Sequence, residues 1–381
     1  MPGFLSDVDL TPNRIERARR QAGAYIDLTS SNPTTQGLLF PPDILRAAAD
    51  GYWSNRAYAP DPRGLLAART AVVADYARRT PQFDVSPNQI FITASTSEAY
   101  SLLFTLLTEP GDNVLGPDVT YPLFEHLAAA HHIALRTYTL DEARGWAIQA
   151  DSLLAAADER TRAILLISPH NPTGSIVAER LPTLTQLGLP LICDEVFAAF
   201  TYRAATTPPL GVLHPELPVF HLNGISKRFA LPDLKLGWMA LNEPAVARFG
   251  ARLEILNDAF LSANSLTQFM LPRLFDQGTA FVATMQARIR AALDMALETL
   301  QRCSNVTVRP PDGGYYLFPQ VAGWDDEEEL VLDLLEAGVL VHPGYFYGCE
   351  QGAHLMISCL TEPTQLRAGL EILVNRLSSP A

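Results

Sequence analysis

One lysine, Lys227, ends an apolar run within the stretch from His221 to Trp238, HLNGISKRFALPDLKLGW. Residues Val219 to Leu222 predict a short buried strand, and an Asn-Gly pair then breaks it before a loop that presents Ser226, Lys227 and Arg228. Ligands of open α/β sheets bind beyond the carboxyl ends of the strands, and a partly desolvated lysine there is suited to Schiff-base chemistry. A lone lysine after a strand is far more often a solvated surface charge, so the rest of the chain must decide.

A second strand end carries hydroxyl residues. Residues Ile90 to Thr93 alternate like a strand, and Ser95, Thr96 and Ser97 then open a helix that has Glu98 in its first turn. The first turn of a helix gathers unpaired backbone N–H groups and a partial positive charge, so it binds phosphate readily. The alternative is an ordinary helix cap with no ligand.

Two more strand-like runs end in polar groups. Residues Ala163 to Ser168 are continuously apolar, as expected for a strand buried on both faces, and lead into an Asn-Pro-Thr-Gly turn that begins at Asn171. The run from Pro190 to Cys193 ends at Asp194. A turn and a strand cap would explain these residues separately, but their shared place at strand ends indicates a binding site.

The lysine stretch supplies the decisive pattern: Ser-Lys, then Leu-Pro, then a basic residue before Leu-Gly. This pattern resembles the pyridoxal-phosphate lysine motif of the class I and II aminotransferases, which are fold type I enzymes. The resemblance implies that Lys227 holds pyridoxal 5'-phosphate as an aldimine and moves the Cα proton as general base and acid. It also implies that Asp194 keeps the cofactor ring nitrogen protonated and that Asn171 donates to the phenolic oxygen.

The same resemblance assigns the other site residues. Tyr121 would stack on the pyridine ring, Asn32 would border the substrate pocket, and Tyr58 would reach the cofactor phosphate of the opposite subunit in a homodimer. The remaining phosphate ligands would be Ser95, Thr96, Ser97, Ser226 and Lys235.

Six positions depart from the family pattern, and at two of them, Ser31 and Ser95, a serine stands where a glycine is common. Phe197 replaces a tyrosine, which leaves Asn171 as the main partner of the phenolic oxygen, and Gly224 replaces a phosphate-binding serine. Lys235 replaces an arginine, so the planar guanidinium that binds two phosphate oxygens at once is absent there, although the positive charge remains. Met356 replaces the arginine that clamps the substrate carboxylate, so the identity of the amino donor stays open.

Seven strand-like runs between Ile90 and Leu241, mostly separated by helical stretches, predict an α/β fold with a mainly parallel seven-stranded sheet between helices. We expect a large cofactor-binding domain at 46–275 and a smaller α+β domain at 276–381. The small domain is expected to include an N-terminal arm at 1–45.

Bulk composition limits the function further. The 381 residues have a net charge of −13 and an isoelectric point near 5.0, which disfavour nucleic acid and anionic membranes as partners. The four cysteines show no C-x-x-C spacing, so we expect neither a metal site nor a disulfide framework, and no apolar run suggests a signal peptide or membrane helix. The chain is therefore interpreted as a cytoplasmic enzyme that transfers an amino group from an amino acid or related amine to a 2-oxo acid.

Two alternatives remain from the sequence. A β-lyase of the C–S lyase type, or other carbanion chemistry, can use the same fold and cofactor. A cofactor-sensing regulator would need a basic DNA-binding region, which the N-terminal residues do not suggest.

Overall fold

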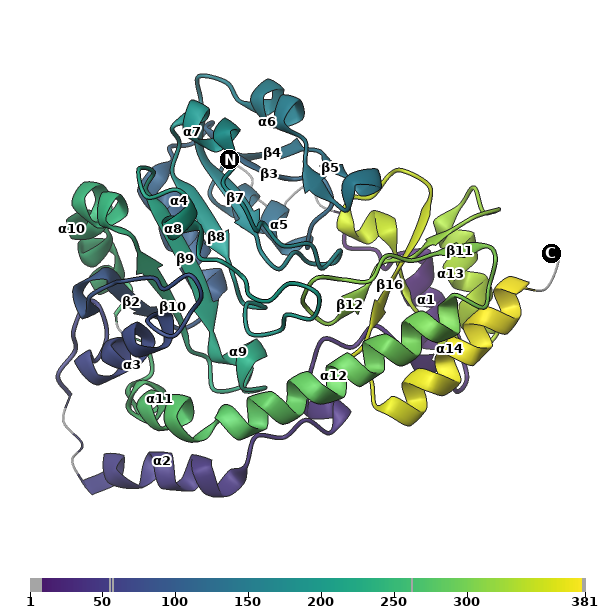
Figure 1. Ribbon diagram of the computed structural model, residues 1–381, viewed down its shortest axis with the longest axis horizontal. Helices are drawn as coiled ribbons and strands as arrows, with labels where there is room; N and C mark the ends of the chain where they lie inside the picture. The colour runs from purple at the N-terminus through teal and green to yellow at the C-terminus, as the bar shows by residue number, and fades with distance from the viewer. Residues whose placement is uncertain (1–8, 55, 57, 262, 379–381) are drawn as a thin grey trace.

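A computed structural model describes residues 9–54, 56, 58–261 and 263–378, and a seven-stranded sheet forms its centre (Figure 1). The strand order is β2-β10-β9-β8-β7-β3-β4, and all strands are parallel except β10, which runs antiparallel to both of its neighbours. The strands are β2 (Ile90–Thr93), β3 (Asn113–Pro117), β4 (Ala134–Tyr138), β7 (Thr161–Ile167), β8 (Leu191–Asp194), β9 (Val219–Gly224) and β10 (Gly237–Leu241). The predicted mainly parallel seven-stranded sheet is therefore confirmed.

The central strands are apolar because both of their faces are covered. In β7, Ala163 and Leu165 pack with α4, α5 and α10, whereas Ile164 and Leu166 pack on the opposite side with α6, α7 and α8. Helices α3 and α11 cover the β2 and β10 end of that opposite face. The helices of this part are α2 (Pro42–Ser54), α3 (Leu66–Tyr76), α4 (Thr96–Leu107), α5 (Leu123–Ala130), α6 (Ala150–Ala156), α7 (Pro182–Leu187), α8 (Leu210–Leu213), α9 (Ile225–Arg228), α10 (Glu243–Ala259) and α11 (Ser265–Gln277).

The C-terminal part builds a smaller sheet of short strands beside the long helix α12 (Thr279–Leu300), which runs from α11 past both parts of the molecule (Figure 1). Its order is β11-β13-β16-β12, with β15 also paired to β16. The strands are β11 (Val306–Thr307), β12 (Tyr316–Leu317), β13 (Gln320–Val321), β15 (His342–Pro343) and β16 (Ala353–Ser358). Helices α13 (Glu327–Glu336) and α14 (Pro363–Ser378) complete this part.

The N-terminal arm joins the C-terminal part. Strand β1 (Ile26–Asp27) pairs in parallel with β14 (Val339–Leu340), and α1 (Arg14–Gln21) packs against α13. The exact domain boundaries stay a prediction. A small hairpin of β5 (Leu140–Asp141) and β6 (Ala147–Ile148) and four 3₁₀ turns connect the elements: η1 (Thr34–Gln36), η2 (Pro87–Gln89), η3 (Glu142–Arg144) and η4 (Gly344–Tyr347).

Among the described helices, none is both long enough and apolar enough to cross a membrane.

Candidate active site

A cavity of about 350 Å³ opens beyond the carboxyl ends of the parallel strands, where the segments that follow β2, β3, β7, β8 and β9 meet. We call it the site cavity. Nine of the residues singled out from the sequence line it: Ser95, Thr96, Ser97, Tyr121, Asn171, Asp194, Ser226, Lys227 and Lys235. The sheet therefore brings together residues that span 141 positions of the chain.

The N-terminus of α4 forms one end of the site cavity. Ser95 caps this helix, because its side chain accepts a hydrogen bond from the Glu98 N–H at 3.1 Å. Thr96 and Ser97 of this first turn line the cavity, and the N–H groups at the start of a helix have no partner within the helix. Gly237 lets β10 pass close to this turn, since a Cβ there would lie 3.0 Å from the backbone nitrogen of Thr96.

Lys235 reaches the same end because β10 is antiparallel. It precedes Gly237 at the start of β10, so the reversal of that strand places it at the carboxyl edge of the parallel strands. Its backbone has φ of +47°, in the left-handed region that a lysine adopts at a cost of about 1 kcal/mol or more. This strained conformation lies at the site and presents the second cation to the cavity.

Asp194 is the buried carboxylate of the site, 7% exposed. One of its oxygens accepts from the backbone N–H of Val196 at 3.0 Å, and the other accepts from the Tyr100 hydroxyl at 2.8 Å. Burial raises the pKa of Asp194 to about 6, while these two hydrogen bonds and the charge of Lys227 oppose the rise. A cation placed beside Asp194 would favour its ionised form.

Lys227 lies in a short helix, not in the loop that the sequence predicted. The helix α9 is a single turn, closed by the Phe229 N–H donating to Ile225 O at 3.0 Å, and a single turn is too short to show helical periodicity. The Lys227 amine lies 3.5 Å from Ser31 O of the N-terminal arm. Burial lowers the pKa of Lys227, although Asp194 opposes this shift, so the amine is suited to act as nucleophile and base.

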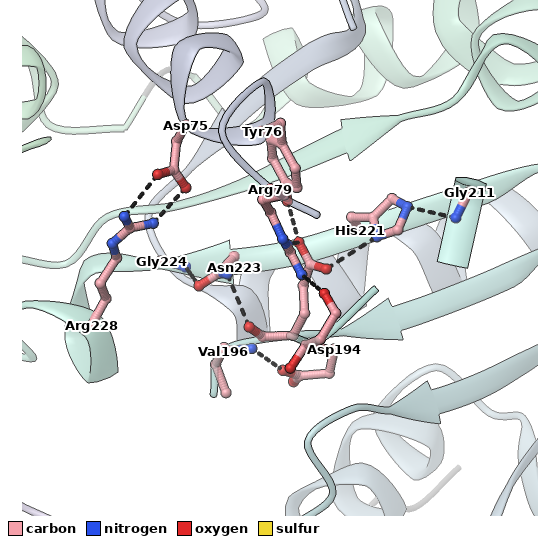
Figure 2. Close-up of polar contacts among 12 residues, drawn as sticks. Asp75, Tyr76, Arg79, Asp194, Val196, Gly211, His221, Asn223, Gly224 and Arg228 are labelled. Carbon is pink, nitrogen blue, oxygen red and sulfur yellow. Dashed lines mark hydrogen bonds and ion pairs between the residues drawn. The ribbon is translucent and has the colours of Figure 1, made fainter. Parts of the chain in front are cut away.

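A network of polar side chains behind the cavity links the residues next to Asp194 and Lys227, namely Glu195 and Arg228, to the end of α3 (Figure 2). Glu195, next to Asp194, accepts from the Tyr76 hydroxyl and from Arg79 at 2.8 Å. Although burial alone would raise the pKa of Glu195, its partners hold it at about 2. Arg228, next to Lys227, makes a two-pronged ion pair with Asp75, one of its bonds 2.7 Å long.

Asn223 joins the ends of the two central strands within this network. Its amide nitrogen donates to Glu195 O at 2.9 Å, and its amide oxygen accepts from the Gly224 N–H at 2.7 Å (Figure 2). A Cβ at Gly224 would lie 2.8 Å from Leu236 O, which explains why this chain has glycine where the family pattern has serine. The end of α3 and Asn223 together fix the spacing between Asp194 and Lys227.

The hydrogen bonds of this network occupy side-chain atoms that could bind a metal ion. Cys193, Glu195 and His221 are the described residues whose side chains come close enough to share one. However, His221 Nε2 accepts from the Gly211 N–H at 3.0 Å, so Nδ1 carries the proton that points to Glu195 at 3.3 Å. With Glu195 also paired to Arg79, the lone pairs that a metal needs are in use.

Three predicted site residues do not line the cavity of this chain. Tyr58 is 81% exposed, as a residue that serves another subunit would be, but the single chain does not test that role. Asn32 is exposed, and its side-chain oxygen accepts from the N–H and hydroxyl of Thr34 at 3.1 and 2.7 Å. Met356 is 2% exposed on β16, opposite His342. Their assignments to the site stay predictions.

Tyr100, Ser31 and Tyr316 line the cavity without having been assigned a role from the sequence. The sequence could have predicted that Tyr100 lies at the site, because it follows Thr96 by four residues and so lies on the same face of α4. Ser31 is held by long-range pairing, since its neighbour Ser30 accepts from the Ser358 hydroxyl at 2.6 Å. Phe197 lines the cavity as well, with its ring 4.7 Å from that of Tyr315.

Lysine is absent from the rest of the chain. The sequence has 26 arginines and only two lysines, Lys227 and Lys235, and both line the site cavity. Outside the site cavity, the Lys and Arg positions are therefore all arginine, and both lysine amines of the chain lie at one site.

The model of the family "Aminotransferase class I and II" matches residues 24–373. The chain belongs to the class I and II aminotransferase family. The sequence interpretation as an aminotransferase of fold type I is thus confirmed, and the lyase alternative is not favoured.

Several similar proteins are themselves named as aminotransferases. An alanine aminotransferase of Mycobacterium tuberculosis is 29% identical over 382 residues, covering 95% of this chain and 88% of that protein. Glutamate-pyruvate aminotransferase AlaA of Escherichia coli is 27% identical, with 95% and 93% covered. Nicotianamine aminotransferase 1 of rice is 27% identical over 331 residues, and the match covers 81% of this chain but 65% of that protein.

Solved structures share the fold over nearly the whole chain. An alanine aminotransferase from Pyrococcus furiosus superposes with a TM-score of 0.85 at 25% identity, covering 95% of this chain and 94% of that one. An aminotransferase from Escherichia coli gives a TM-score of 0.87 at 25% identity, covering 100% and 98%.

Proposed function

We propose that this protein is a pyridoxal-phosphate-dependent aminotransferase in which Lys227 holds the cofactor and transfers its proton. The observation that carries the proposal is that the only two lysines of the chain line one cavity together with the buried carboxylate of Asp194. One amine would serve the chemistry and the other would serve the phosphate. The family is generally pyridoxal-phosphate-dependent, which is consistent with this assignment.

The residues present fit the cofactor at both ends. The dianionic phosphate would meet the α4 N-terminus, Ser226 and Lys235, all of which are donors or positive. The ring nitrogen would meet Asp194, and Tyr121 offers an aromatic face to the ring. The cofactor, when bound, supplies an aldehyde for the amine of Lys227 and an electron-withdrawing ring.

The chain itself would provide orientation and proton transfer. Asp194, fixed by Tyr100 and Val196, would hold a proton on the ring nitrogen. Lys227, once displaced by the substrate amine, would be free in a partly dry cavity to take the Cα proton and return it. Asn171 would donate to the phenolic oxygen, since Phe197 cannot.

Chemical trapping tests the lysine assignment. Borohydride reduction of the holoenzyme followed by peptide mapping should place the pyridoxyl group on Lys227. Because Lys235 is the only other lysine, it is a complete internal control. A label on Lys235, or no label on either residue, would refute the role of Lys227.

The substrates are proposed as an amino acid or related amine and a 2-oxo acid. Alanine and glutamate are reasonable first donors because relatives carry those names. A substrate carboxylate in a partly dry cavity needs a charged partner, and Met356 offers none. A single-turnover scan should therefore compare L-amino acids with simple amines, for wild type and Met356→Arg. If wild type converts L-alanine or L-glutamate at ordinary aminotransferase rates and Met356→Arg gives no gain, Met356 does not limit carboxylate recognition.

A homodimer with shared sites is also proposed. Trp53, Leu66 and Phe269 are exposed on α2, α3 and α11, and α11 packs against both other helices. Phe260 and Leu261 are exposed at the end of α10. An apolar surface of this kind is typical of a protein interface.

Subunit mixing tests the shared site. Combining Tyr58→Phe chains with Lys227→Ala chains should restore some wild-type sites if Tyr58 serves the partner. A monomer with full cofactor occupancy would refute the dimer. Location in the cytoplasm stays an expectation from the sequence.

A further inference from the structure

A second cluster of reactive groups lies outside the site cavity. Cys349 Sγ lies 3.4 Å from His354 Nδ1, and His354 Nε2 lies 3.2 Å from Glu142 Oε1. The cysteine follows η4 and the histidine lies five residues later on β16, whereas the carboxylate begins η3, so the fold assembles the cluster from two segments far apart in the chain. The aminotransferase chemistry proposed above uses none of these side chains.

The surroundings of His354 favour its doubly protonated form. Nε2 faces a carboxylate oxygen, and Nδ1 also lies 3.4 Å from Gly352 O, and both oxygens can only accept hydrogen bonds. Although burial alone lowers the pKa of His354, its bonds to Cys349 and Glu142 raise it to about 10. A doubly protonated His354 can donate from Nδ1 to the Cys349 sulfur, which is the arrangement in which a histidine activates a thiol.

The ring of His354 is also held in position. Phe318 stacks on it with centroids 5.0 Å apart and planes at 18°, and Trp146 meets it edge-on at 5.8 Å. Since His354 itself is fully buried, its Nδ1 cannot turn away from the sulfur without disturbing these rings. The geometry is therefore that of a thiol with a fixed base and an orienting carboxylate.

Cys349 lines a cavity of its own, of about 440 Å³, which we call the thiol cavity. None of the described residues that line it is a lysine or arginine. Four of them are carboxylic acids: Asp118, Glu125, Glu142 and Glu350. A cavity with this charge disfavours anionic reagents and admits small neutral ones.

The other thiols differ. Burial raises the pKa of Cys193 well above its usual range, and it raises that of Cys359 as well. Cys303 is 3% exposed and Cys349 is 4% exposed, so these two differ by the contact of Cys349 with His354 and not by burial. Cys193, Cys303 and Cys359 provide an internal comparison for any claim of selective reactivity.

We propose that Cys349, His354 and Glu142 form a reactive-thiol site that a small neutral hydroperoxide oxidises. The Cys349 thiolate attacks one peroxide oxygen and the O–O bond breaks. Cys349 is oxidised by two electrons to a sulfenic acid, and the peroxide is reduced. The leaving oxygen, an alkoxide from an organic hydroperoxide or hydroxide from hydrogen peroxide, takes a proton from the His354 imidazolium and departs as an alcohol or as water.

Timed alkylation of the native holoenzyme tests the reactivity. Iodoacetamide labelling followed by peptide mapping should show Cys349 modified first, while Cys193, Cys303 and Cys359 react only after denaturation. Brief treatment with hydrogen peroxide followed by dimedone should place the sulfenic-acid adduct on Cys349. Labelling of Cys349 no faster than the other three cysteines would overturn the proposal.

Two matched variants test the role of the carboxylate. Glu142→Gln should slow alkylation of Cys349 about tenfold, because it removes a charge-assisted hydrogen bond to His354. Glu125→Gln removes a carboxylate from the same cavity without touching His354, so it should leave the rate within about twofold of wild type. Equal rates for Glu142→Gln and wild type, with both variants folded by thermal unfolding, would overturn the proposed cluster.

The charge of the cavity gives a separate test. Neutral iodoacetamide should modify Cys349 faster than anionic iodoacetate by a larger factor than it does a free thiol such as glutathione. An equal or smaller factor at Cys349 would contradict the acidic thiol cavity as the entrance.

Discussion

Tyr100→Phe is expected to weaken cofactor binding without loss of core packing. The substitution removes only the hydroxyl, which lies 2.8 Å from an oxygen of Asp194, and keeps the ring that packs 4.9 Å from Phe124. Both Tyr100 and Asp194 are buried, so water does not replace the lost donor. The substitution therefore acts on the carboxylate that would pair with the cofactor ring.

The expected magnitude depends on the type of bond. A hydrogen bond to a buried charged group is worth about 1.5–3 kcal/mol, so the affinity for pyridoxal phosphate should fall at least about tenfold. The pKa of Asp194 is already about 6, and losing a donor raises it further. The loss of affinity should consequently be greater at pH 6 than at pH 8, where more of the carboxylate is ionised.

Tyr138→Phe is the matched control. Tyr138 is equally buried, and its hydroxyl donates at the same 2.8 Å distance, but to the neutral carbonyl oxygen of Leu165. This substitution should cost about 0.5–1.5 kcal/mol of unfolding free energy and leave cofactor affinity unchanged.

Absorbance titration of the apoenzyme with pyridoxal phosphate at the two pH values measures the affinities. Denaturant unfolding measures the stability of each variant. If Tyr100→Phe and Tyr138→Phe bind the cofactor equally well, the bond to Asp194 has no special role and the reasoning fails.

Three further predictions concern the surrounding structure. Because burial raises the pKa of Asp194 to about 6, its contribution to apoenzyme stability is present below about pH 4 and is lost as the pH rises through about 6. Relative to Asp194→Asn, the wild-type apoenzyme should lose about 3 kcal/mol of unfolding free energy over that interval, and parallel pH profiles would contradict this. Gly224→Ser should lower cofactor affinity because its Cβ would meet Leu236 O, whereas Gly23→Ser, in open space, should not, and equal affinities would show that the close contact is harmless. Glu195→Gln should lower the unfolding free energy by about 3–5 kcal/mol, since it leaves a buried arginine without its charge partner, and a loss below about 1 kcal/mol in urea unfolding would rule out a strong buried pair.

The sequence determined the parts of the site that depend on local order. Apolar runs bounded by turn residues marked the strands, and a parallel sheet places the residues after each strand at one edge. That is sufficient to bring Ser95, Asn171, Asp194 and Lys227 together without knowledge of any side-chain contact. The sequence also shows that the chain has only two lysines, and both belong to the predicted site.

Only the tertiary structure decided the position of Lys235. Residues that precede a parallel strand lie at the opposite edge of the sheet from the site, and Lys235 reaches the site because β10 runs antiparallel. Strand direction depends on pairing with β9 and β2, and apolar periodicity does not encode it.

Long-range contacts decided the rest. Ser31 is brought to Lys227 because the arm pairs with β14 and hydrogen-bonds to Ser358 of β16. Glu142 meets His354 across 212 positions of the chain. Local pattern gives the face of a helix or strand on which a residue lies, but the partner across a gap is fixed by how whole elements pack. The sequence thus specified the strand-end chemistry, whereas packing between distant segments specified which groups hold it in place.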